Sequence, residues 1–98
     1  MIVRIVRMHF QAKRIPEFRA LFAERKEQIR SMPGCNHLEL WQDESEPAIF
    51  FTYSHWESAA HLDSYRFSPY FKETWTLTKV LFAQKAEAWS VSRQVVLD

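Results

Sequence analysis

The segment CNHLELWQDESEPAIFFTYSHW, residues 35–56, decides the fold of this 98-residue chain. Leucine alternates with histidine, glutamate and tryptophan over Cys35–Gln42, and this two-residue period predicts a β-strand. The polar run 43–47 predicts a turn, and Ala48–Trp56, rich in aromatic residues, predicts a second strand. The segment is therefore expected to form a β-hairpin with a five-residue loop.

Upstream of the hairpin, the sequence predicts a strand followed by a helix. Residues Ile2–Phe10 are rich in β-branched side chains, which favours a strand. Pro16 suits the first turn of a helix, and apolar residues then recur at three- and four-residue steps to about Ser31. Gly34 follows the helix and is the only glycine in the chain, so we expect it at a positive φ.

Downstream of the hairpin, the sequence predicts two helical segments and a last strand. Ser58 can cap a short helix, and the pair Ser68-Pro69 can start a second one. An apolar stripe continues the second helix to Phe82, and residues Ala86–Val96 are predicted to close the chain as a strand.

The predicted order of elements is β-α-β-β-α-β, which is typical of a ferredoxin-like α+β fold. We expect a single domain, residues 1–98, with a four-stranded antiparallel sheet and both helical segments on one face. The hydrophobic content is 47%, high for so small a domain, and the other sheet face would expose large apolar side chains. A second copy related by a twofold axis is the expected cover, giving a homodimer with the form of an α+β barrel.

Composition argues against several classes of protein. Thirteen basic and twelve acidic residues leave a net charge of +1, and many of the basic residues recur along a predicted helix, as on a solvated face. This pattern does not favour nucleic-acid binding. A chain with one glycine can build neither a phosphate-binding loop nor a dinucleotide-binding turn, so no tightly bound nucleotide cofactor is expected.

The cysteine count and the apolar runs bear on location. Cys35 is the only cysteine, so no internal disulfide can form, and the chain suits a reducing compartment. Arg4 and Arg7 interrupt the first apolar stretch, and no uninterrupted apolar run exceeds four residues. We therefore expect a cytoplasmic protein with no membrane span.

Histidine supplies the candidate catalytic residue. The four histidines His9, His37, His55 and His61 fall on four different predicted elements, so no metal site is expected. His61 lies four residues before Tyr65 on the short helix, which places both side chains on one helical face. A neutral imidazole there could remove a proton from an acidic hydroxyl group. The alternative is a partly exposed ring that only packs.

Aromatic residues supply the candidate substrate contacts. Tyr65, Phe71 and Trp75 could form the walls of a flat cavity for an aromatic ligand, although an aromatic stripe at helical spacing is also typical of an ordinary core. Tyr53 and His55 alternate together near the end of the predicted third strand, where either could reach the mouth of a pocket.

The segment YSHWESAAHLDSYRFSPYFK, residues 53–72, resembles the most recognisable part of the antibiotic biosynthesis monooxygenase family. The matching features are Trp56-Glu57, Ala60-His61-Leu62 and the step from Ser68 to Phe71, together with the turn Met32-Pro33-Gly34-Cys35. The resemblance implies a dimeric α+β barrel whose subunits each hold a pocket between sheet and helices. It also implies oxidation of polycyclic phenols by molecular oxygen without metal or flavin. His61 would be the base, with Tyr65 and Trp75 shaping the cavity.

A related branch of the same superfamily degrades haem, and this sequence departs from its pattern. Val6 and Arg7 stand where that branch has asparagine, Tyr65 stands at the tryptophan position, and Trp75 stands where the histidine ligand would lie. Haem degradation is therefore not expected.

Three functions remain open from the sequence. The first is a cofactor-independent monooxygenase that acts on an aromatic phenol. The second is a noncatalytic ligand-binding or interaction protein on the same scaffold, because a fold does not fix a function. The third is an isomerase of small cyclic compounds, which would need acid-base groups but no oxygen.

Overall fold

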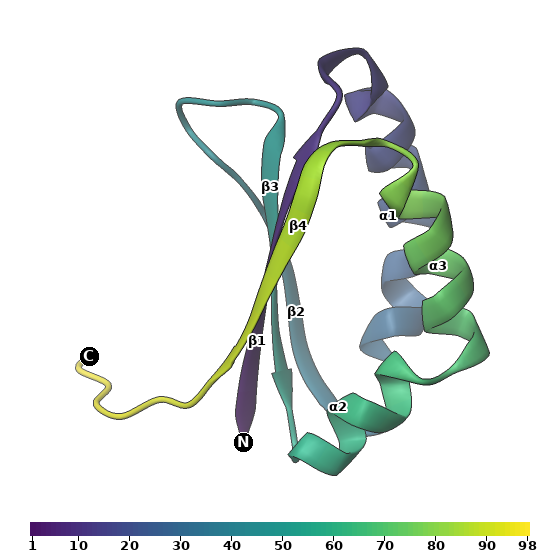
Figure 1. The fold of residues 1–98 in the computed structure, drawn as a ribbon. Helices are drawn as coiled ribbons and strands as arrows, with labels where there is room; N and C mark the ends of the chain where they lie inside the picture. Colours follow the sequence, from purple (N-terminus) through teal and green to yellow (C-terminus); the bar gives the residue numbers. More distant parts are fainter.

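The chain folds into a four-stranded antiparallel sheet whose helices all lie on one face (Figure 1). The structure is a computed structural model that describes residues 1–98. The strands lie in the order β2-β3-β1-β4. Their bounds are β1 (Ile2–Phe10), β2 (Cys35–Gln42), β3 (Ile49–Trp56) and β4 (Phe82–Val91). The predicted ferredoxin-like arrangement and the hairpin are confirmed.

The helices begin where the sequence predicts. A 3-10 helix, η1 (Ala12–Arg14), precedes α1 (Ile15–Arg30), and α2 (Ala59–Arg66) and α3 (Pro69–Lys79) follow the hairpin. Both predicted caps are present: Ser58 Oγ accepts a hydrogen bond from the backbone N–H of His61, and Ser68 Oγ accepts one from that of Phe71. None of the helices is long and apolar enough to cross a membrane.

The predicted bounds of the last strand, 86–96, are wrong. The second helical segment ends at Lys79, and β4 already begins at Phe82, which pairs with Phe10. Val91 pairs with Val3 at the other end of the ladder, and β1 starts at Ile2, so later residues have no neighbouring strand to bond. Residues 92–98 leave the sheet as an extended tail (Figure 1).

The turn between α1 and β2 has the conformation expected from its glycine. Gly34 has a φ of 85°, a left-handed value that glycine adopts without strain. Its carbonyl accepts a hydrogen bond from the backbone N–H of Glu57, at 2.8 Å. The turn therefore fixes the start of β2 beside the end of β3.

The core between the sheet and the helices consists of two clusters. One joins the buried side chains Met8, Phe10, Phe18, Phe50 and Leu81. The other joins Cys35, Trp56 and Leu62, with Tyr65 packed against it. On β3 the helix-facing positions run from Phe50 through Thr52 and Ser54 to Trp56, so small side chains separate the two clusters.

Candidate functional site

A cavity of about 360 Å³ lies between the helices and the helix-facing side of the sheet. Twelve of its eighteen lining residues are hydrophobic. This size and this largely apolar character are typical of sites for small organic molecules. All four strands contribute lining residues, as do α1, α2 and α3.

The cavity exists because small side chains occupy the middle of the interface. Val6 on β1, Thr52 and Ser54 on β3 and Ala88 on β4 all line it, while the bulky residues of the two clusters lie at its ends. These side chains are too short to fill the space between the sheet and the helices, although the rest of the core is closely packed. This hollow was not predicted, although the sequence signal is present: small polar residues at core-facing positions of β3.

An aromatic row forms one wall of the cavity. The Tyr65 ring stacks on Trp56 with ring centroids 4.9 Å apart and meets Phe71 edge-on at 5.0 Å. Phe71 in turn stacks on Trp75 at 5.9 Å. Three of the residues expected to contact an aromatic ligand, Tyr65, Phe71 and Trp75, therefore lie together and line the same cavity. Flat rings in such a row can contact a flat aromatic ligand.

Tyr65 lines the cavity, and its hydroxyl group has no hydrogen-bond partner in the protein. Burial raises the pKa of this phenol above its ordinary value, so the group stays protonated at neutral pH. No hydrogen bond to another protein group contributes to that shift. Tyr65 can therefore donate a hydrogen bond to an oxygen atom of a ligand.

Two guanidinium groups are the only charged groups that line the cavity, and neither was predicted from the sequence. Arg4 lies on the helix-facing side of β1, and its Nη1 donates to Ser90 Oγ at 3.0 Å. Burial, followed by repulsion from Arg66, lowers the pKa of Arg4. Arg66 lies at the end of α2, where its Nη1 is 3.8 Å from a carboxylate oxygen of Asp63. No carboxylate and no imidazole lines the cavity.

His61 does not line the cavity. Its Nδ1 lies 2.8 Å from Ser58 Oγ, and its ring packs over the turn at Gly34. A Cβ atom built on Gly34 would lie only 2.3 Å from His61 Cγ. These contacts tie the start of α2 to the α1–β2 turn. The role of His61 as a base stays a prediction that these contacts do not favour.

Tyr53 and His55 were expected to reach the mouth of the pocket. They lie instead on the opposite face of the sheet and do not line the cavity. Successive side chains of a strand alternate between faces, and their neighbours Thr52 and Ser54 already face the helices. Tyr53 Oη is 2.7 Å from His55 Nε2, and Arg93 of the tail donates to Tyr53 Oη at 3.1 Å. Burial lowers the pKa of His55, and the charge of Arg93 adds to this shift.

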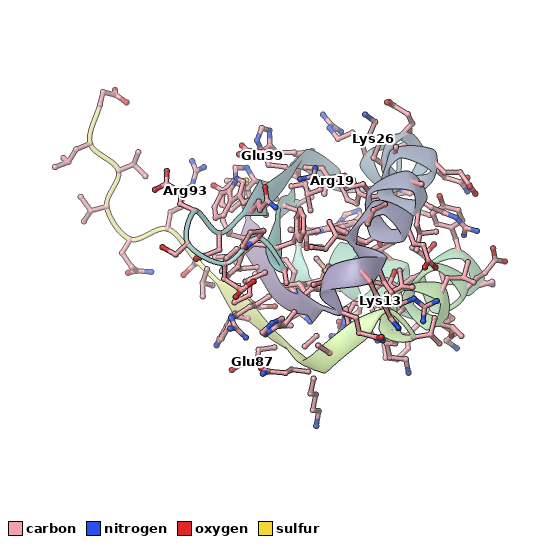
Figure 2. All side chains as sticks on the ribbon, turned by 90° about the horizontal axis from the view of Figure 1, so that it is seen from above. Lys13, Arg19, Lys26, Glu39, Glu87 and Arg93 are labelled. Atoms are coloured by element: carbon pink, nitrogen blue, oxygen red, sulfur yellow. The ribbon has the colours of Figure 1, made fainter.

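The sheet face away from the helices, here called the open face, carries partly exposed large side chains. Trp41, Trp89 and Val91 are 40%, 43% and 44% exposed. Figure 2 shows Glu39 and Glu87 at opposite edges of the sheet, with Arg93 on the tail that leaves it. Glu39 is bonded to His37 and Trp41, and Glu87 is paired with Arg7, so both acidic groups already have polar partners.

Comparisons with known proteins agree with this architecture. A family model described as antibiotic biosynthesis monooxygenase matches residues 1–76. An uncharacterized protein of Synechocystis is 37% identical over 71 residues, and the match covers 72% of this chain but 48% of that relative.

Solved structures extend the likeness over nearly the whole chain. A crystal structure of an antibiotic biosynthesis monooxygenase superposes with a TM-score of 0.90 at 21% identity, covering 97% of this chain and 100% of that one. A conserved protein from Methanosarcina mazei superposes with a TM-score of 0.89, also at 21% identity, covering 96% and 94% of the two chains. At these identities the likeness establishes the fold.

Proposed function

Because the chain belongs to the antibiotic biosynthesis monooxygenase family, we propose that it uses molecular oxygen to oxidise an aromatic, phenolic small molecule in its cavity. The observation that carries the proposal is the aromatic row along a largely apolar cavity of about 360 Å³. A flat substrate would bind against Phe71 and Trp75 with most of its surface removed from water.

The proposed chemistry takes its electrons from the substrate. The phenol or anthrone would lose a proton to bulk water before it enters the cavity, and the resulting electron-rich anion would react with oxygen at carbon. One oxygen atom is retained as a quinone carbonyl, and the other leaves as water together with the two hydrogens that the substrate loses. The protein would hold the ring in one orientation and exclude water. Tyr65 would donate a hydrogen bond to the oxygen atom on which negative charge develops.

Replacing Tyr65 with phenylalanine tests this role of the hydroxyl group. The variant keeps the ring that stacks on Trp56 but loses the donor, so its rate of oxygen uptake should fall at least about tenfold with little change in thermal stability. The measurement is oxygen consumption with an anthrone substrate. Tyr70→Phe is the matched control, because its hydroxyl donates to the Arg25 carbonyl outside the cavity. Equal rates in both variants would contradict a donor role for Tyr65.

One observation favours a second candidate function, a noncatalytic ligand-binding protein. No carboxylate or imidazole lines the cavity, so no side chain there is a ready general base at neutral pH. The same observation argues against the isomerase, whose chemistry requires acid-base groups. Oxygen consumption separates the two remaining functions, because a binding protein would take up ligand without consuming oxygen.

We also propose that a second copy of the chain covers the open face. Trp41 and Trp89 are large and partly exposed there, and the two acidic groups of this face already have polar partners. A face with matched charges and exposed apolar side chains is suited to a partner with the same surface across a twofold axis. The tail residues Val95 and Leu97 add further exposed apolar surface.

Light scattering tests the dimer. One chain has a mass of 11.8 kDa, and the wild-type protein at micromolar concentration should have twice that mass. Trp89→Glu should give the mass of one chain, because the substitution would bury a carboxylate without a partner in the proposed interface. Leu77→Glu is the matched control, since Leu77 is also 43% exposed but lies on α3. A monomeric wild-type protein, or a dimer unaffected by Trp89→Glu, would contradict the proposal.

A further inference from the structure

All the charged side chains that line the cavity are positive. Arg4 and Arg66 come from β1 and from the end of α2, and every other side chain that lines the cavity is neutral. The two groups lie close enough that the charge of Arg66 lowers the pKa of Arg4. A largely apolar cavity therefore has a cationic end.

Asp63 neutralises this end only in part: its charge raises the pKa of Arg4, but burial and repulsion from Arg66 outweigh that effect. Arg4 is half-buried and bonds only the neutral hydroxyl of Ser90, whereas Arg7, on the other face of the same strand, is paired with Glu87 at 3.5 Å. Arg66 has Asp63 at 3.8 Å, a loose pair of two exposed side chains that contributes little. A half-buried guanidinium without an anionic partner is costly, and an anionic ligand would offset that cost.

The cationic end also lies where a ligand can enter. Phe67, the residue after Arg66, lines the cavity and is nevertheless 70% exposed. The side chain of Arg66 is itself 43% exposed. The aromatic row formed by Tyr65, Phe71 and Trp75 extends from this region along the cavity wall. One flat molecule could therefore place a charged group at the guanidinium groups and its rings against the row.

We propose that the ligand is a flat aromatic acid bound as its anion, with an ionised carboxylate or phenolate oxygen held between Arg4 and Arg66. The planar guanidinium forms paired hydrogen bonds with such an oxyanion, and a neutral phenol, ester or amide offers a weaker partner. The inference rests on the proposed function only in placing the ligand in the same cavity. It adds that the ligand is selected by its charge and is oriented by its anionic group.

Calorimetric binding of naphthoate and naphthamide tests the inference. The two probes share their rings and nearly their shape but differ in charge. The wild-type protein should bind naphthoate at least about tenfold more tightly, the difference expected for a hydrogen bond to a charged group. Arg4→Met should lose most of that preference while its affinity for naphthamide changes little. Arg66→Met is a second variant that should weaken the same preference. Arg66 is exposed, so this test remains valid if the fold does not tolerate the change at Arg4.

Lys72→Gln is the matched control, because it removes one positive charge from an exposed position of α3 outside the cavity. It should keep the wild-type preference for naphthoate. Three results would overturn the inference. The wild-type protein could bind both probes equally or bind neither, or the preference could persist when Arg4 and Arg66 are both methionine. Because no turnover is measured, selective binding without oxygen uptake would refute the monooxygenase and leave this inference standing.

Discussion

Replacing Thr52 with phenylalanine is expected to abolish the binding of aromatic ligands while leaving the fold intact. Thr52 lies at the middle of β3 and lines the cavity, between the helix-facing positions of Phe50 and Ser54. A phenyl ring there would project into the middle of a cavity of about 360 Å³ and would occupy the space in which a flat ligand must lie. Phenylalanine is favourable in strands, and its ring would bury further apolar surface. The affinity for naphthoate should therefore fall by about a hundredfold or more, equivalent to ~3 kcal/mol.

The control for this variant is Thr76→Phe. Thr76 is an exposed residue of α3 whose hydroxyl donates to the Lys72 carbonyl, and it does not line the cavity. The same substitution there should leave ligand binding unchanged. Calorimetry gives the two affinities, and circular dichroism shows whether each variant is folded. A folded Thr52→Phe protein that binds naphthoate as tightly as the wild type would show that the ligand binds elsewhere.

Substitution of Gly34 with alanine should cause the largest loss of stability. A φ of 85° costs a residue with a Cβ atom about 1–2 kcal/mol. The new Cβ would lie 2.3 Å from Cγ and 2.5 Å from Cβ of His61, so the ring and the start of α2 must both move, and such overpacking typically costs about 1–3 kcal/mol. The free energy of unfolding should therefore fall by about 2–5 kcal/mol, and the Tm of so small a domain by at least about 10 °C.

A double variant separates the two contributions. In Gly34→Ala with His61→Ala the ring is absent, but the Cβ atom of residue 61 still lies 2.5 Å from the new Cβ, so the overpacking is relieved in part and the backbone strain remains. Urea unfolding of both single variants and of the double variant should show this coupling as an interaction energy of at least about 1 kcal/mol. Additive effects, or a Gly34→Ala protein as stable as the wild type, would contradict the packing of His61 over this turn.

The fold was predictable because its local signals agree with one another. The alternation in residues 35–42, the serine caps at Ser58 and Ser68 and the single glycine at Gly34 each indicate the element that the structure contains. The last strand was misplaced because its bounds are set by pairing. Phe82 joins β4 because Phe10 is its partner, and the strand ends where β1 offers no further residue. Neither limit is visible in the local composition.

The candidate site was predictable only in part. Helical spacing identified the aromatic residues Tyr65, Phe71 and Trp75, which do line one cavity. Arg4 was passed over because a single arginine in a strand gives no sign of which face it occupies. Its face follows only from the register that places Val6 and Met8 toward the helices. The position of His61 depends on the tertiary contact with the Gly34 turn, which its helical spacing does not reveal.

Oxygen uptake by the purified protein is the most direct test of the proposed function. The substrates are a panel of anthrones, hydroquinones and flavonoid-like phenols, with a metal chelator present and no cofactor added. We expect the wild-type protein and Thr76→Phe to take up oxygen with at least one acidic aromatic substrate, and we expect folded Thr52→Phe to take up none. Two results would contradict the proposal that the cavity is a monooxygenase active site. One is folded protein that binds naphthoate but takes up no oxygen with any substrate, and the other is oxygen uptake that persists in Thr52→Phe.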